Sequence, residues 1–412
     1  MSAPLFFGLS HIGQVFSLGW AEKFGSAAVF DFDAAARARF RGGELTHEEP
    51  ELVPVWRDVH DRISVIDDPA RVADHDVVFL TLDTPLDLDG EPDTEAVFAF
   101  LRRVPTLLGR DATLILLSQV YPGFCARVRA EVLKDRPDVK LVYMVDTLKM
   151  GVAMTRFRTP EQLVFGVASA DHVPKEFADF KCPQAVLTHA EAEMVKIAIN
   201  LYLLVGVSFA NAMDTYCREL GFRFGPIADC LRNDERIGRK AYLSPSLGIS
   251  GGHLERDLST VLQRCADAGT RALFAQLKAV NDVRMMLLFG AVRDVAAHTP
   301  VRRVLWMGAS YKAQSFSLVN SPLLKFVRRY GETLDIEVHD GLYEVPALAG
   351  MRATPDLAQA LGRADLVVLN YARPEDLAVL RDRLTAGTPP VLDISLPDAF
   401  AGAAPPAVRR LL

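Results

Sequence analysis

The chain has 412 residues, 50% hydrophobic and 24% charged, with a formal net charge of -6 at pH 7. This length predicts two or three packed units, and the mild acidity argues against a nucleic-acid surface, which needs concentrated positive charge. The five cysteines form no C-x-x-C pair and are expected to be buried reduced thiols. No apolar run suits a membrane span and no secretion signal is recognisable, so we expect a cytoplasmic protein.

Strand-like apolar runs alternate with helical patterns from Leu5 to about Gly166. This alternation is typical of βαβ units around a parallel sheet. The clearest predicted strands in this part are 27–32, 77–82 and 113–117.

The middle of the chain has a helical pattern, because apolar residues recur every 3.6 residues over 190–220 and again over 257–297. A second α/β pattern follows, with predicted strands at 303–308, 336–340, 365–369 and 390–393. We therefore predict an α/β fold with two Rossmann-like domains, each with a mainly parallel sheet, joined by a central helical domain with a long connecting helix. The predicted domains are 1–187, 188–298 and 299–412.

A glycine-rich segment follows the first predicted strand. Residues 8–13 read GLSHIG, and the next predicted strand leads into Asp31. In a Rossmann domain such glycines allow a tight turn and close approach of a pyrophosphate, and the acid binds the adenosine ribose. Ser10 replaces the second glycine, and Asp31 would repel a 2′-phosphate, so NAD is favoured over NADP. Taken alone, the segment fits a strand-turn-helix without a nucleotide equally well.

Further segments match the motifs of one family in order and spacing. They are 41–44 with 49–50, 83–85 with 89–90, 118–123, 192–200, 233–238, and 308–312 with 321–322. In these segments the chain resembles the UDP-glucose/GDP-mannose dehydrogenases, which are nucleotide-sugar 6-dehydrogenases. The family's Gly-Thr-Pro turn is read here as Asp83-Thr84-Pro85, and Gln119 replaces a threonine near the nicotinamide.

This resemblance implies an NAD-dependent oxidoreductase of polysaccharide biosynthesis with a nucleotide-sugar substrate. Lys196 and Asn200 would stabilise the developing oxyanion, and Arg236 would reach the substrate of the other subunit in a homodimer. Lys312 would face the substrate's phosphates, the alternative being an exposed loop lysine. The implied cofactor-binding residues are Gly8, Ser10, His11, Ile12, Gly13, Asp31, Thr84, Pro85 and Gln119. The implied substrate-binding residues are Arg236, Gly251, Gly252, Tyr311 and Lys312; no metal site is predicted.

The chain departs from the family at its catalytic cysteine. The family segment Gly-Gly-Ser-Cys-Phe-x-Lys-Asp is read here as GGHLERD over 251–257, which places His253 at the nucleophile and keeps Asp257. The cysteine holds the aldehyde covalently during a four-electron oxidation, and an imidazole cannot form the equivalent thioester. His253 could instead take the hydroxyl proton, with Asp257 orienting it, or could fill a vacated pocket without a role.

Other departures concern hydrolysis and charge. Asp146 keeps the first carboxylate of the family's Pro-Glu-Phe-Leu-x-Glu-Gly segment, whereas Met150 replaces the second. Asp146 could serve another proton transfer or bind backbone. Val319 and Ser395 stand where arginines are expected. Three consequences are possible: the nucleotide-sugar could differ from UDP-glucose, it could bind more weakly, or NAD could bind in a different position.

Three functions remain open on these residues. The first is a single two-electron oxidation of a nucleotide-sugar, with Lys196, Asn200 and His253 polarising the reacting oxygen and one NADH formed per turnover. The second is a redox-neutral epimerase that uses NAD transiently. The third is a catalytically silent homologue that binds a nucleotide-sugar or a partner subunit.

Overall fold

The computed structural model describes residues 3–46, 49, 51–85, 93–149, 151–313, 317–342, 344–384, 389–396, 399–400 and 405–412. The chain forms two compact units, and the boundary between them lies in one long helix, between Ile199 and Asn200. Pro50, Asp89, Gly90 and Met150, which belong to the predicted motifs, lie outside the described residues. The predicted three-domain division stays a prediction.

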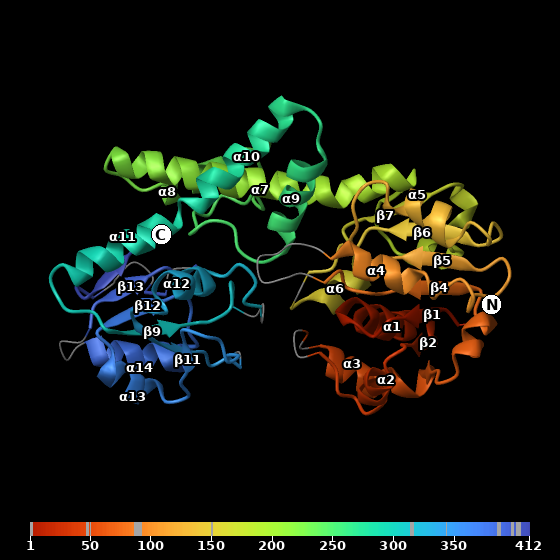
Figure 1. Ribbon diagram of the computed structural model, residues 1–412, viewed down its shortest axis with the longest axis horizontal. Coiled ribbons are helices and arrows are strands. Elements are labelled where there is room, and N and C mark those ends of the chain that lie inside the picture. Colours follow the sequence, from red (N-terminus) through yellow and green to blue (C-terminus); the bar gives the residue numbers. More distant parts are fainter. Residues whose placement is uncertain are drawn as a thin grey trace. The chain divides into compact units, whose positions relative to one another are not determined.

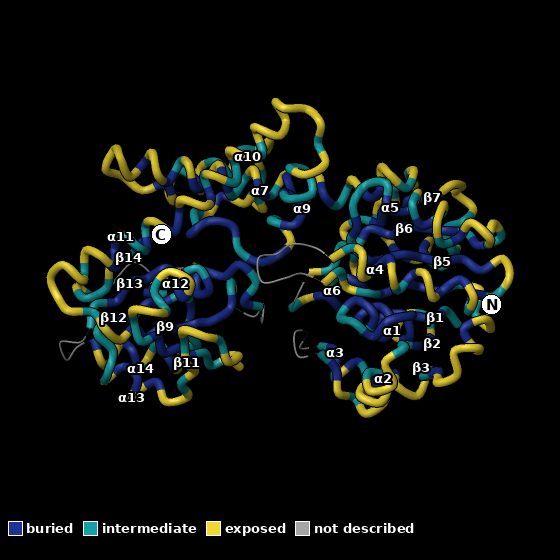
Figure 2. Tube along the Cα trace, viewed as in Figure 1, coloured by how far each residue is buried: buried dark blue, intermediate teal, exposed yellow. Residues whose placement is uncertain are grey.

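The first unit is built on an eight-stranded sheet with the strand order β3-β2-β1-β4-β5-β6-β7-β8. Its strands are β1 (Leu5–Phe7), β2 (Ala27–Phe30), β3 (Ile63–Val65), β4 (Val77–Leu80), β5 (Thr113–Leu116), β6 (Lys140–Met144), β7 (Leu163–Val167) and β8 (Gln184–Leu187). All neighbours pair in parallel except β6 and β7. The central strands are buried, drawn dark blue in Figure 2, as strands of parallel sheets covered by helices usually are.

Helices cover this sheet and join its strands (Figure 1). They are α1 (His11–Phe24), α2 (Ala34–Arg41), α3 (Leu52–Val59), α4 (Thr94–Leu101), α5 (Phe124–Arg127) and α6 (Ala153–Arg158). Helix α1 contacts α3 and α6 beside the sheet. It ends at Gly25, whose positive φ of 93° provides a left-handed C-cap.

The second unit combines helices with a six-stranded parallel sheet of order β11-β10-β9-β12-β13-β14. The strands are β9 (Arg303–Met307), β10 (Asp335–His339), β11 (Arg352–Ala353), β12 (Leu366–Leu369), β13 (Val391–Asp393) and β14 (Val408–Arg410). The helices are most of α7 (His189–Glu219), then α8 (Gly225–Asn233), α9 (His253–Arg264), α10 (Ala268–Asp282), α11 (Met285–Ala296), α12 (Pro322–Tyr330), α13 (Leu357–Arg363) and α14 (Pro374–Leu384).

Both sheets have the Rossmann strand order, in which the first strand of each sheet lies between its second and fourth. The predicted fold class is therefore confirmed. The one long helical pattern predicted over 257–297 is resolved into α9, α10 and α11. The break has a local cause, because Asp267 caps α10 by accepting a hydrogen bond from the Thr270 N–H (2.6 Å).

Helix α7 is the one helix in the described part of the chain that is long and apolar enough to cross a membrane by length and composition. Two of its carboxylates contradict that assignment. Glu193 and Asp214 are buried and accept hydrogen bonds from protein groups on other segments. We therefore interpret α7 as a scaffold helix of a globular protein.

Candidate functional site

A tight glycine turn joins β1 to α1 in the first unit. Gly8 has a φ of 111°, a left-handed value that favours glycine. A Cβ added to Gly13 would lie 1.8 Å from the Gly8 carbonyl oxygen, so only glycine lets α1 start this close to the turn. Ser10 donates its hydroxyl to the Thr81 carbonyl (2.6 Å), and Ile12 is buried in the core. The predicted cofactor turn therefore has Rossmann geometry.

Two carboxylates lie at this turn. Asp31, directly after β2, accepts hydrogen bonds from the backbone N–H groups of Leu9 (2.8 Å) and Asp33 (2.9 Å). Asp83, in the segment after β4, accepts one from the backbone N–H of His11, the first residue of α1 (3.2 Å). Asp31 thus occupies the position predicted for the ribose acid, whereas the contact of Asp83 was not predicted.

The loops after β4 and β5 are bonded to each other. Thr84 donates its hydroxyl to the Gln119 carbonyl (2.6 Å), and Ser118 donates to the Leu82 carbonyl (2.7 Å). Pro85 follows on the exposed side of the first loop. The predicted residues Thr84, Pro85 and Gln119 are therefore brought to the same sheet edge as the glycine turn.

A buried glutamate fastens the second of these loops to α7. Glu193 is 0% exposed and accepts hydrogen bonds from the backbone N–H groups of Gly123 (2.6 Å) and Cys125 (2.7 Å). The same carboxylate adds to the effect of burial, which raises the pKa of the Cys125 thiol well above its usual range. Glu193 therefore positions loop 118–123 relative to the helix that carries Lys196.

A second buried carboxylate holds residues 151–153 at the start of α6. Glu49 accepts hydrogen bonds from the backbone N–H groups of Gly151 (2.6 Å) and Ala153 (2.9 Å), and its Oε1 lies 3.0 Å from the His11 Nε2. Glu49 therefore links residues 151–153 to the first residue of α1, a set of contacts that the 49–50 motif did not predict.

Lys196 and Asp146 meet in the first unit. The Lys196 ammonium donates to the Asp146 backbone carbonyl (2.7 Å), and the Asp146 carboxylate accepts from the Leu148 N–H (2.8 Å). The structure therefore favours the backbone-binding interpretation of Asp146 in this state. Its proton-transfer role stays a prediction.

Asn200 and Asp257 form a buried pair in the second unit. The Asn200 amide donates to Asp257 Oδ2 (2.6 Å), and Arg256 Nε donates to Asp257 Oδ1 (3.1 Å). Arg256 is 5% exposed, and its Nη2 is buried without a hydrogen-bond partner among the described residues. These contacts fix Asp257, whose predicted role in orienting His253 remains a prediction.

His253 is the first residue of α9 and is exposed. The preceding Gly251 has a φ of 77°, and a Cβ added there would lie 3.0 Å from the Tyr311 ring. Gly252 caps the helix. The imidazole therefore stands at the positive end of a helix, beside a turn that only glycine adopts easily.

The thiols of the second unit do not replace the missing cysteine locally. Cys265 caps the opposite end of α9, a helix of 12 residues, which corresponds to about 18 Å at 1.5 Å per residue. Cys217 is buried in the small core of α7 and α8, and Cys230 lies on α8.

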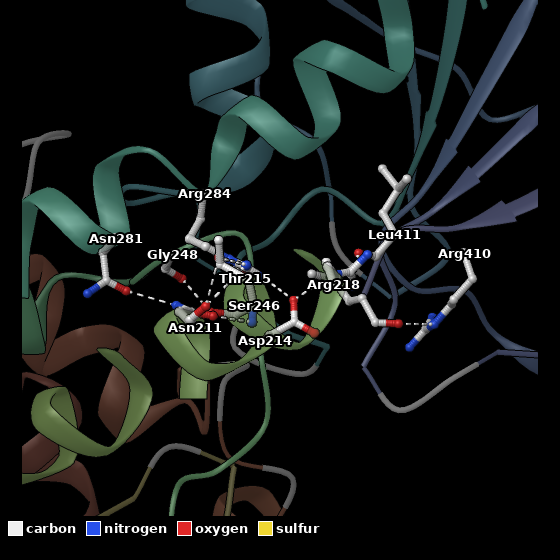
Figure 3. A network of polar contacts seen from close by, with 11 residues as sticks. Asn211, Asp214, Thr215, Arg218, Ser246, Gly248, Asn281, Arg284, Arg410 and Leu411 are labelled. Atoms are coloured by element: carbon white, nitrogen blue, oxygen red, sulfur yellow. Dashed lines mark hydrogen bonds and ion pairs between the residues drawn. The ribbon is translucent and has the colours of Figure 1, made fainter. Parts of the chain in front are cut away.

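A buried polar network holds the segment that precedes His253 (Figure 3). Arg284 donates to Asp214 (2.8 Å) and to the backbone carbonyl of Ser246 (2.9 Å). Asn211 accepts from the Ser246 N–H (2.7 Å) and donates to Asn281 (3.0 Å). Ser246, seven residues before His253, is therefore fixed by α7 and by Arg284, the residue just before α11.

The remaining predicted substrate residues lie on loops. Lys312 and Tyr311 follow β9, and Lys312 is exposed. Arg236 pairs with Asp234 (2.6 Å), yet its side chain is 89% exposed. Near Ser395, where an arginine was expected in sequence, Arg410 from β14 donates to the Ser395 hydroxyl (3.1 Å). The local cation thus comes from another strand, which no motif spacing indicated.

These features define a Rossmann dinucleotide-binding unit followed by a second, Rossmann-like unit. The turn fits NAD because Gly8 and Gly13 let α1 begin directly after β1, and Asp31 follows β2 at the position of the ribose acid in a Rossmann domain.

The chain belongs to the UDP-glucose/GDP-mannose dehydrogenase family. The family's NAD binding domain matches residues 5–179 and its central domain matches residues 190–283. The cofactor is NAD, as the family's NAD binding domain implies.

Similar proteins include UDP-glucose 6-dehydrogenases of Rhizobium meliloti and Pseudomonas aeruginosa. The first is 25% identical over 410 residues, 94% of this chain and 93% of the relative. The second is 26% identical over 389 residues, 89% and 84% of the two chains. One Bacillus subtilis relative, 25% identical, is matched over 64% of this chain and only 63% of its own length.

Solved structures share the fold. A UDP-glucose dehydrogenase from Pyrobaculum islandicum superposes with a TM-score of 0.81 at 22% identity, over 96% of this chain and 94% of that one. A UDP-D-ManNAc dehydrogenase from Pyrococcus horikoshii gives a TM-score of 0.84 at 17% identity, over 99% of both chains.

Proposed function

We propose that this protein is an NAD-dependent oxidoreductase that removes two electrons from a carbinol of a nucleotide-activated sugar and stops at the aldehyde or ketone. The observation that carries the proposal is His253 at the first position of α9, where the family has its cysteine. Without a thiolate, no thioester forms, so the second oxidation of the family reaction has no covalent intermediate.

NAD, when bound, accepts the hydride from the carbinol carbon. The chain's own residues handle the proton and the charge on oxygen. We assign His253 to take the hydroxyl proton, because an imidazole titrates near neutral pH. Lys196 and Asn200, one turn apart on α7, are assigned to stabilise the developing negative charge on that oxygen.

Asp257 supports this assignment through Asn200. Its carboxylate accepts from the Asn200 amide (2.6 Å) and from Arg256 (3.1 Å), so the orientation of the Asn200 amide is held by a charged partner. We assign Asp257 to positioning Asn200, in addition to the predicted role toward His253.

We also propose that the working form is a cytoplasmic homodimer. Helix α7 exposes an apolar stripe, defined as Tyr202, Val205, Phe209 and Tyr216, at spacings of three, four and seven residues. Side chains at these spacings share one face of a helix. The stripe is about 21 Å long at 1.5 Å per residue, and an exposed apolar surface of this kind is typical of a protein interface.

A second copy of the same chain is the occupant we propose for this stripe. Arg236, in the segment just after α8, extends an 89% exposed guanidinium. An exposed arginine suits the predicted role of contacting the substrate held by the other subunit.

The proposal is tested by incubating the protein with NAD and a panel of nucleotide-sugars, and analysing the sugars by mass spectrometry and NMR. A product two hydrogens lighter than its substrate supports the proposal. A uronic acid contradicts it. An inverted sugar of unchanged mass indicates the epimerase, and unchanged sugars together with no NAD binding by calorimetry indicate the silent homologue.

A further inference from the structure

The N-terminus of α1 is the place where a Rossmann domain binds the phosphates of its dinucleotide, through backbone N–H groups and the positive end of the helix dipole. In this structure a carboxylate of the chain itself lies there. Asp83 accepts a hydrogen bond from the N–H of His11, the first residue of α1 (3.2 Å). The family's turn has glycine at this position.

We propose that Asp83 sets the affinity for NAD by competing, as a carboxylate, with the dinucleotide's phosphate for the start of α1. A bound pyrophosphate must displace this carboxylate or stand beside it. Both carry negative charge, so either arrangement weakens binding while Asp83 is ionised. Protonation of Asp83 removes the charge and with it most of the competition.

The surroundings of Asp83 raise the pKa of its carboxyl group above the usual value. The residue is exposed as a whole, yet desolvation of the carboxyl group raises its pKa. The Asp146 carboxylate, from the segment after β6, raises it further. His11, through its charge and its N–H, and the Ser10 hydroxyl act in the opposite direction.

Further charged groups lie on the elements around this cluster. Glu49 pairs with the His11 ring (3.0 Å), and the Lys196 ammonium binds the backbone carbonyl of Asp146 (2.7 Å). Protonation of His11 would also attract phosphate at low pH. The pH dependence that belongs to Asp83 is therefore the part that disappears when Asp83 is replaced.

The direction of the effect follows from these charges. Ionised Asp83 opposes the phosphate, so NAD binds most weakly above the pKa of Asp83 and more tightly as the pH falls through it. A protein with an uncharged side chain at position 83 is expected to bind NAD more tightly than the wild type wherever Asp83 is ionised. From the Coulomb energy of two charges near a protein surface, reduced by salt, we expect a roughly tenfold difference at pH 8.

The test compares the wild-type chain with Asp83→Asn and Asp83→Gly by calorimetric titration with NAD from pH 8 to pH 5.5. Asp74→Asn is the matched control, because it removes one carboxylate of the same unit, which pairs with Arg71 on the surface. Thermal unfolding of each variant confirms that the first unit is folded. Both Asp83 variants are expected to lower the NAD Kd roughly tenfold at pH 8, and the control to leave it unchanged.

The ratio of the wild-type Kd to the Asp83→Asn Kd is expected to be large at pH 8, where Asp83 is ionised. A ratio of one at pH 8 overturns the proposal. The measurement is of binding alone, so it stands whether or not the two-electron oxidation is confirmed.

Discussion

Removing Asp214 by the substitution Asp214→Asn is expected to destabilise the second unit more than removing its partner Arg284. Arg284 and Asp214 are 2% and 5% exposed and lie 2.8 Å apart. Burial lowers the pKa of Arg284 and the Asp214 carboxylate opposes that decrease. In Asp214→Asn the guanidinium stays buried with only neutral acceptors, and breaking such a pair costs about 3–5 kcal/mol.

Arg284→Met leaves a better compensated charge. Asp214 keeps a hydrogen bond from Arg218 (2.8 Å), whose side chain is partly exposed. We therefore expect a cost near 3 kcal/mol for this variant, at the lower end of the range for a broken buried pair. The double variant Asp214→Leu with Arg284→Met removes both buried charges and should cost less than the sum of the single changes.

Hydrogen-exchange mass spectrometry measures this result, because it reports each unit separately. Residues 243–252 and α10 should exchange faster in both single variants, and the increase should be larger for Asp214→Asn than for Arg284→Met. Peptides of the first sheet serve as the internal control. Equal protection in both single variants, or a greater loss for Arg284→Met, would refute the assignment of Asp214 as the central anion of the network in Figure 3.

Three further variants test the role of Glu193, the position of residue 253 and the proposed dimer interface. Glu193→Gln keeps the shape of the side chain but loses the charge that binds two backbone N–H groups. The free energy of unfolding of the first unit, measured in denaturant, should therefore fall by about 1.5–3 kcal/mol. An unchanged free energy of unfolding would show that other contacts hold loop 118–123. His253→Cys places a thiol at a helix N-terminus, where the positive end of the helix lowers thiol pKa values. Iodoacetamide should therefore label this thiol faster than the wild-type cysteines, and the variant should form a covalent adduct with the substrate in the presence of NAD. Labelling at the same rate as the wild-type cysteines would argue against the placement of residue 253 at the start of α9. Tyr202→Arg together with Phe209→Arg should convert the dimer to a monomer in light scattering, whereas a wild type that is already monomeric would contradict the proposed interface.

The fold could be predicted from local patterns because each one has a local cause. The runs around β1, β4 and β9 are apolar on both faces, which indicated covered parallel sheets. The turn at Gly8 and Gly13 was recognisable because only glycine meets its steric demands. The 3.6-residue apolar period predicted the long helix α7. Its exposed apolar stripe could be recognised only once the exposure of each side chain was known.

The site was less predictable because its polar contacts join residues far apart in sequence. Asp83 meets His11 across 72 positions, and Glu193 meets Gly123 across 70. Neither contact has a periodic signal. Arg410 likewise reaches Ser395 from another strand. The motif lacks its arginine at position 395, but the structure still places a guanidinium there. The break between α9 and α10 depended on the Asp267 cap, which the apolar period did not reveal.

We infer that an imidazole in place of the thiol limits the reaction to one hydride transfer. The most direct measurement is the number of NADH molecules formed per molecule of nucleotide-sugar consumed, read by absorbance with the sugar as the limiting reagent. One NADH per sugar and a carbonyl product are expected. Two NADH per sugar, with a carboxylic acid formed, would contradict it.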